Sequence, residues 1–175
     1  MKKIISLFLF TVLINTSSSC ESDDICDSPT TPRLIINFYD SSNPTTLKSV
    51  SKLFIIGEDM KTGFLFNGVS TIQVPLDTEK DVAKYVFTLN YNDPNPNKIF
   101  KDTLEFNYTR QTIYVSRACG YKINYNFNPK NTTPQAVILN NDPKNISGSW
   151  IKLIRILNYN VSTENEAQIN IYYNY

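Results

Sequence analysis

From Pro32 to the C-terminus, short runs of β-branched and aromatic residues are separated by clusters of Asn, Asp, Pro and Gly. Apolar runs of this length, bounded by turn-forming residues, are typical of β-strands. No window of comparable length shows the 3.6-residue period of an amphipathic helix. The pattern predicts strands over 33–39, 51–57, 62–66, 71–76, 84–89, 103–108, 112–117, 121–127, 136–139, 150–157 and 168–173.

Several predicted strands alternate apolar and polar residues with period two, which buries one face and leaves the other in water. Two such sheets can cover each other's apolar faces without helices. We therefore expect an all-β fold, an antiparallel β-sandwich, with a β-barrel as the alternative. The alternation is clearest in three sets of residues: Leu104, Phe106 and Tyr108; Tyr121, Ile123, Tyr125 and Phe127; and Ile169, Ile171 and Tyr173.

The N-terminal 19 residues have the layout of a secretory signal, with Lys2 and Lys3, an apolar run over 4–14 and small residues over 16–19. The apolar run is shorter than the roughly 20 residues that cross a bilayer. The chain is thus expected to have three parts: a lipoprotein signal peptide over 1–19, an acidic flexible tether over 20–31 and a single β-sandwich domain over 32–175.

Cys20 follows Ser18 and Ser19 and precedes an acidic stretch over 21–24. Small residues before such a cysteine are typical of bacterial lipoproteins, whose cysteine receives a diacylglyceryl group. Several acyl chains anchor a protein firmly, because each buried methylene contributes about 0.8 kcal/mol. Cys20 is therefore the expected lipidation site, which places the protein on the outer membrane of a cell envelope, either periplasmic or surface-exposed. Ser17 replaces the usual leucine-like residue, so a soluble secreted protein is the alternative.

The chain has three cysteines, and lipidation of Cys20 leaves Cys26 and Cys119 as one pair. Such a pair can oxidise in an exported protein. A bridge would close a loop of 119 − 26 = 93 residues, which the chain-entropy treatment values at about 4 to 5 kcal/mol. Two separate thiols are the alternative, because sequence alone gives no geometry.

The sequence contains no histidine. This excludes imidazole metal ligands and the Ser-His and Cys-His forms of nucleophilic catalysis. Removal of Lys2 and Lys3 with the signal leaves 17 − 2 = 15 basic residues against 16 acidic ones. A nearly neutral chain lacks the clustered basic surface that nucleic-acid binding requires. We expect no cofactor, no metal and no nucleic-acid partner.

Three stretches, TPRLIINFYD (31–40), NPTTLK (43–48) and EFNYTRQTIYVSRACGYK (105–122), resemble an uncharacterised family of flavobacterial envelope lipoproteins from the Bacteroidota, domain of unknown function 6452. The resemblance runs from the leader cysteine to the region of Trp150, and YVSRACG is its most specific part. It includes an Asp-Ile-Cys segment like 24–26, which adds weight to the pairing of Cys26 with Cys119. It implies an envelope location and an architecture, but no catalytic residues.

Two short motifs carry candidate chemistry. Asp102-Thr103-Leu104 resembles the O-glycosylation signal of exported Bacteroidota proteins, which makes Thr103 a candidate site, with an unmodified threonine as the alternative. Segment 93–104 begins with the alternating oxygen ligands of a calcium loop, but it lacks the glycine and the final acidic ligand that such a loop needs. A rigid surface turn is favoured there.

Arginine and aromatic residues offer two further candidates. Arg110 and Arg117 flank the strand that leads to Cys119, and they suit either an anion contact or a structural use. The structural use, as solvent-facing strand residues or as a pair with Glu105, is favoured. Trp150 and the tyrosines suit either a sugar-binding platform or the core, and the core is favoured.

These observations predict a non-catalytic structural or binding module, attached to the membrane by its lipid, that contacts an envelope protein or a glycan. One alternative is a carboxylate-dependent hydrolase such as a carbohydrate-active enzyme, which requires a cleft with two acidic side chains about 5 to 10 Å apart. Another is a subunit of a surface assembly completed by a donated strand, which requires an unpaired hydrophobic groove.

Overall fold

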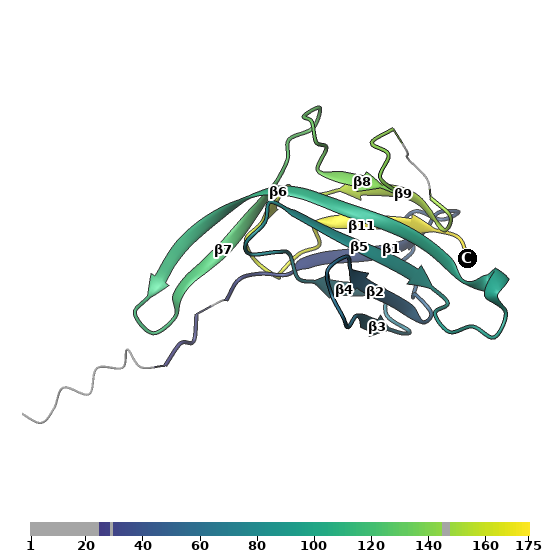
Figure 1. The fold of residues 1–175 in the computed structure, drawn as a ribbon, viewed down its shortest axis with the longest axis horizontal. Coiled ribbons are helices and arrows are strands. Elements are labelled where there is room, and N and C mark those ends of the chain that lie inside the picture. The colour runs from purple at the N-terminus through teal and green to yellow at the C-terminus, as the bar shows by residue number, and fades with distance from the viewer. Residues whose placement is uncertain (1–24, 29, 145–147) are drawn as a thin grey trace, which may run out of the picture. The chain divides into compact units, whose positions relative to one another are not determined.

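A computed structural model describes residues 25–28, 30–144 and 148–175 and shows an all-β fold (Figure 1). Within these ranges there is no α-helix, and the only helical segment is the 3₁₀ helix η2 (Pro96–Lys98). The strands are β1 (Leu34–Asp40), β2 (Leu53–Gly57), β3 (Phe64–Phe66), β4 (Thr71–Val74), β5 (Val82–Leu89), β6 (Phe100–Ser116), β7 (Gly120–Phe127), β8 (Val137–Leu139), β9 (Ile151–Ile156), β10 (Asn160–Val161) and β11 (Ile169–Tyr173).

The strands form two sheets. The four-stranded sheet has the order β4-β1-β11-β9, and the seven-stranded sheet has the order β10-β7-β6-β5-β2-β3, with β8 paired to β6. The arrangement is sandwich-like and not a closed barrel, so the predicted fold class is confirmed. One pair departs from the antiparallel rule, because β1 and β11 run parallel with Ile36 opposite Ile169. Period-two alternation does not encode strand direction, so the sequence could not reveal this pair.

The core lies between the inner faces of the two sheets. Leu104, Phe106 and Tyr108 are at most 1% exposed, as their alternation predicts. Its largest side chain is Trp150, whose indole N–H donates to the main-chain oxygen of Phe87 at 3.3 Å. Trp150 directly precedes β9, the edge strand of the four-stranded sheet. Its contact with Phe87 therefore joins that edge to β5 of the other sheet.

The prediction of two separate strands over 103–108 and 112–117 is wrong. The ranges 103–108 and 112–117 belong to one continuous strand that ends at Ser116. The residues between them are polar and exposed, which interrupts the alternation, but main-chain pairing with β7 does not require apolar side chains. The prediction that Tyr121 belongs to the buried face of its strand is also wrong, because its side chain is 69% exposed.

The chain forms two compact units. The smaller comprises Met1–Ser28 and Tyr114–Tyr121, of which 25–28 and 114–121 are described, and the larger comprises Pro29–Ile113 and Lys122–Tyr175. The expected signal peptide and residues 20–24 of the tether lie outside the described residues. The boundaries 1–19, 20–31 and 32–175 therefore stay predictions. In the part of the chain that is described, no helix has the length and apolar character of a membrane span.

Candidate functional site

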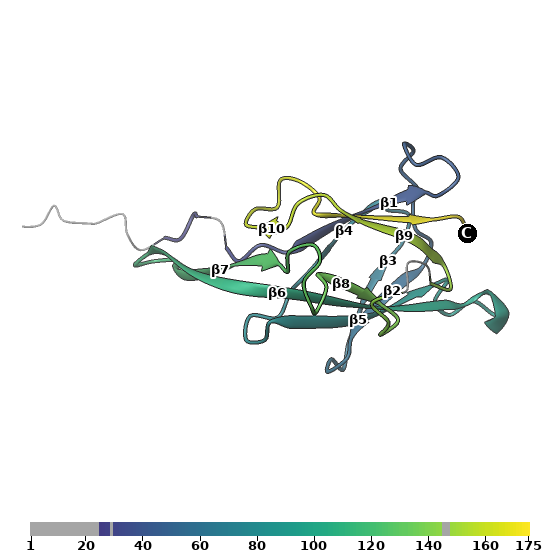
Figure 2. The same cartoon turned by 90° about the horizontal axis from the view of Figure 1, so that it is seen from above.

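A groove of about 310 Å³ is lined by residues of β8 in the seven-stranded sheet and of β9 in the four-stranded sheet. Figure 2 shows the ribbons of these two strands. Val137, Ile154 and Ile156 line it and remain only partly buried, although they also pack against the core. Apolar side chains of the sandwich interior are therefore accessible from solvent at this position. The other apolar residues of the lining are Pro129, Ala136, Leu139, Pro143, Leu153 and Tyr159.

Strand β9 is the last strand of its sheet, so one side of its main chain has no neighbouring strand among the described residues. Leu157 N–H donates to the oxygen of Gln168 at 2.8 Å, and Ile156 and Ile154 face Ile169 and Ile171. Because an antiparallel ladder alternates, the N–H and C=O groups of Ile154 and Ile156 point to the free side. A free main-chain edge beside an apolar groove is the arrangement used for strand addition.

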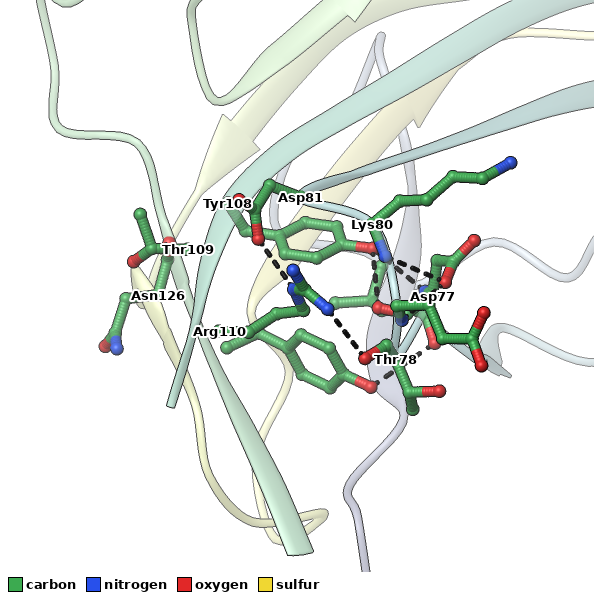
Figure 3. A network of polar contacts seen from close by, with 11 residues as sticks. Asp77, Thr78, Lys80, Asp81, Tyr108, Thr109, Arg110 and Asn126 are labelled. Atoms are coloured by element: carbon green, nitrogen blue, oxygen red, sulfur yellow. Dashed lines mark hydrogen bonds and ion pairs between the residues drawn. The ribbon is translucent and has the colours of Figure 1, made fainter. Parts of the chain in front are cut away.

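The opposite edge strand, β4, leads directly into the segment 75–81, which crosses to β5 in the other sheet. Three buried tyrosines hold this crossing, and Figure 3 labels one of them, Tyr108. The hydroxyls of Tyr85, Tyr125 and Tyr108 donate to the main-chain oxygens of residues 75–77 at 2.7, 3.3 and 3.1 Å, in that order. Three consecutive carbonyl groups are thus satisfied from the core side, which closes this side of the sandwich.

Burial raises the pKa of all three hydroxyls, and the charge of Asp77 adds to the effect. The pKa of Tyr85 reaches about 12. Arg110 covers the same crossing from outside, because its guanidinium donates to Asp81 at 2.7 Å and to the main-chain oxygen of Thr78 at 2.8 Å (Figure 3). Arg110 is exposed, in agreement with a solvent-facing strand residue, but its structural partner is Asp81 and not Glu105.

Asp102 links the start of β9 to β6. Its carboxylate is 1% exposed and accepts main-chain N–H groups from Ser149, Trp150 and Ile151 at 2.7, 2.9 and 3.0 Å. The side-chain amide of Asn140 adds a fourth bond at 2.9 Å. A buried carboxylate with four donors is well satisfied. Its position therefore indicates a structural role at one end of the groove.

A second hollow, of about 370 Å³, borders β5 and contains four carboxylates that the hydrolase alternative could use. Each carboxylate already has a partner within the protein. Glu58 pairs with Lys84 at 3.2 Å and Asp59 with Lys80 at 3.0 Å. Asp77 accepts the N–H groups of residues 79 and 80, and Glu105 accepts the amide of residue 107 at 3.1 Å. This set of contacts favours a structural use of the four acids.

A third hollow, of about 490 Å³, is lined by polar residues at the start of β1 and in the loop after β10. Its charged residues are Arg33, Lys122 and Glu164. Arg33 and Glu164 form a two-pronged pair at 2.8 and 2.7 Å. The contact lowers the pKa of Glu164, chiefly through the hydrogen bonds from Arg33. Both groups are engaged with each other, so the groove between β8 and β9 is the better candidate.

The residues singled out in the sequence lie in different places. Cys20 is outside the described residues. Cys26 and Cys119 form a disulfide in the smaller unit, with their Cα atoms 4.9 Å apart. Thr103 lies in β6 between two inward-facing residues, Asp102 and Leu104, and its own side chain is partly exposed. Glycosylation of Thr103 stays a prediction. The acidic residue of the same motif is Asp102, which is buried.

The segment 93–97 is a turn stabilised by its own side chains. Asp93 accepts the N–H of Asn95 at 2.9 Å, and Asn95 accepts the N–H of Asn97 at 3.0 Å. No group of three or more Cys, Asp or Glu side chains in the described ranges is close enough to hold a metal ion. Trp150 is fully buried in the core, as favoured, and Arg117 is exposed.

The groove was not visible in the sequence, although β9 carries a signal of it. Its residues Ile151, Leu153, Ile154 and Ile156 break strict alternation, and the register shifts near Ile151. Such irregularity is common at sheet edges. Because the groove also needs β8 from the other sheet, its position depends on the tertiary fold.

Residues 52–173 match the family of unknown function DUF6452, so the chain belongs to this family. The match covers both groove strands, the tyrosines of the crossing and Asp102. No curated protein and no solved structure is significantly similar to the chain.

Proposed function

We propose that this protein is a non-catalytic binding module of a Gram-negative cell envelope, anchored in the outer membrane through lipid on Cys20. The layout of residues 1–20 supports the anchor, and the disulfide between Cys26 and Cys119 suits an oxidising compartment. The family resemblance supports an origin in the Bacteroidota. The module binds an extended segment of another envelope protein, which adds to β9 as a further strand.

The free edge of β9 beside the groove carries this proposal. A peptide in strand conformation would pair with the main chain of Ile154 and Ile156, while every second side chain of the peptide would enter the groove. The groove has apolar residues from both strands beside polar ones such as Lys130 and Gln135, so β-branched or aromatic side chains with a polar group suit it best. The same mode describes a subunit of a surface assembly that receives a donated strand.

The anchor is tested by intact-mass analysis of protein purified from envelopes, with Cys20→Ser as the control. We expect acyl mass on the wild type and membrane association that Cys20→Ser loses. A wild type without acyl mass, or a variant that still fractionates with membranes at the wild-type level, would contradict the anchor.

The groove is tested by photo-crosslinking in intact envelopes. A benzophenone amino acid replaces Ile156 in the groove or, as a matched control, Leu65, which is 62% exposed on the edge strand β3. We expect a protein adduct from position 156 that position 65 does not give.

Ile154→Pro should abolish that adduct, because it removes a main-chain N–H that points to the free side and not to β11. Circular dichroism and the melting temperature check that the variant is folded. Equal adducts from both positions, or an adduct that survives Ile154→Pro in a folded protein, would contradict strand addition. An adduct with a sugar polymer would replace the protein partner by a glycan.

A further inference from the structure

We propose that the hairpin tip between β6 and β7, residues 114–121, rests in the headgroup layer of the membrane that holds the lipid anchor. The partner is a phospholipid surface. The inference rests on the proposed anchor at Cys20 and adds a second contact with the membrane, made by protein side chains.

The hairpin tip exposes an aromatic pair. Tyr114 and Tyr121 are 56% and 69% exposed, and their rings meet edge to face with centroids 5.3 Å apart. A tyrosine ring has an apolar body and a hydroxyl end, which suits the boundary between lipid chains and water. Arg117, in the turn, is also exposed and can place its guanidinium against phosphate groups. The tip therefore combines the side chains that are enriched at membrane interfaces.

The disulfide ties this tip to the leader. Cys26 and Cys119 are bonded, and Cys26 lies six positions after Cys20 along the chain. Six extended residues span at most about 20 Å, so acyl chains on Cys20 would keep the tip within roughly that distance of the membrane. At such short range the effective concentration of lipid surface is high, and weak contacts suffice for binding. Ile25, beside the bridge, is 80% exposed and adds apolar surface.

Charge does not account for this contact. The sequence of the tether contains acidic residues at positions 21, 23, 24 and 27. Arg117 is the only cation within the described residues of the smaller unit. Bacterial phospholipid surfaces are anionic, so long-range attraction is not expected. The contact should depend on the tyrosine rings and be insensitive to added salt.

Fluorescence quenching tests the contact with the acylated full-length protein. The protein is placed on vesicles of phosphatidylethanolamine and phosphatidylglycerol that carry bromine atoms near the headgroups. Tyr121→Trp reports on the tip and Leu65→Trp is the exposed control, while the buried Trp150 supplies a constant background that wild type measures. We expect the indole introduced by Tyr121→Trp to be quenched about twofold or more beyond the control, with no loss at high salt.

The double variant Cys26→Ser/Cys119→Ser, in the Tyr121→Trp background, releases the tip from the leader. Its quenching should fall to that of Leu65→Trp if the bridge holds the tip at the membrane. Equal quenching of the two indoles in acylated, vesicle-bound protein would overturn this inference and leave the anchor intact. Quenching that survives removal of the bridge, or that salt abolishes, would also overturn it. A protein without acyl mass would overturn both the anchor and the tip contact.

Discussion

The two edges of the four-stranded sheet are finished in different ways. At β4 the chain crosses at once to the other sheet, and the hydroxyls of Tyr85, Tyr108 and Tyr125 hold the crossing from inside. At β9 the link to the other sheet is made at the start of the strand, through Asp102. Beyond that point, partly buried isoleucines and free main-chain groups line a groove. At β4 polar contacts thus hold the connection to the other sheet, and we call this the closed edge; at β9 a groove lies beside the strand, and we call this the open edge.

This difference bears on function. A free edge next to apolar side chains is a liability, since it can pair with other chains. Strand β9 carries Lys152 and Arg155, and charged side chains of this kind discourage unspecific pairing. The charges on β9 oppose pairing with arbitrary chains. The open edge therefore fits a site for one selective partner better than a strand that is merely left unpaired.

The largest effect should come from Asp102→Ala, which breaks the Asp102 network between the open edge and β6 of the other sheet. Removal of the carboxylate leaves three main-chain N–H groups without an acceptor, two of them buried, and we expect a loss of about 3 to 5 kcal/mol in the free energy of unfolding. Urea denaturation measures this loss. Hydrogen exchange should show that protection falls first in β9.

Asp102→Asn is the matched control for this substitution. It keeps the shape and one oxygen, so it should cost less than Asp102→Ala but remain destabilising, because its amide would face N–H donors. A loss below about 1 kcal/mol for Asp102→Ala would mean that the network does not secure the edge.

Asp102 also shows how far sequence alone could go. It shares the parity of Leu104, Phe106 and Tyr108, so alternation already places it on the buried face of β6. A buried acid requires donors, and this reasoning predicts a structural role. The donors themselves could not be predicted, because residues 149–151 approach Asp102 only when the two sheets pack together.

The closed edge is tested by Tyr108→Phe. The hydroxyl of Tyr108 donates to the main-chain oxygen of Asp77 at 3.1 Å and accepts its N–H at 2.9 Å. Its removal leaves both groups unpaired in a mostly buried site, and we expect a loss of about 1 to 2 kcal/mol in unfolding free energy. Tyr125→Phe, which removes one bond of 3.3 Å, should cost less. The reverse order in urea denaturation would contradict the assignment of Tyr108 as the main support.

Alkaline pH should weaken the closed edge without any substitution. The pKa of Tyr85 is about 12, raised mainly by burial, whereas an unfolded tyrosine titrates near 10. The folded state therefore keeps a proton that the unfolded chain has lost. Stability from this group is complete below about pH 10 and falls between about pH 10 and 12 as the pH rises, by up to about 1.4 kcal/mol per unit.

Urea midpoints measured from pH 8 to pH 12 follow this loss. Tyr85→Phe should flatten the decline relative to wild type, because it removes the titrating group. A wild-type and a variant profile that fall in parallel would show that other groups, such as Tyr173 with its pKa of about 12, dominate the alkaline range.

The groove beside β9 could not be predicted from the sequence. Most strands and the buried sets around Leu104 and Ile169 followed from the sequence pattern, whereas β10 (Asn160–Val161) was not predicted. The edge position of β9 did not, because strand order is set by contacts between segments far apart in the chain. The break in alternation at Leu153 and Ile154 is a local sign of an irregular strand, but it does not say which strand lies alongside.

The sharpest comparison should come from the same substitution made at two paired residues, and at Ile154 it should have the smallest effect on stability. Ile154 faces the groove, and its partner across the ladder, Ile171, is fully buried. Ile171→Thr places a hydroxyl in the core and should cost about 2 to 3 kcal/mol. Ile154→Thr places the same hydroxyl at a partly solvated position and should cost about 1 kcal/mol or less.

Binding should show the opposite order. If the groove receives a strand, Ile154→Thr should reduce the crosslink from position 156 while the protein remains folded, because the substitution makes the groove more polar. Ile171→Thr, measured at a temperature where it is folded, should leave the crosslink nearly unchanged, since this side chain points into the core. Equal losses of stability at the two positions would mean that the groove is closed in solution, and the distinction between the two edges would then fail.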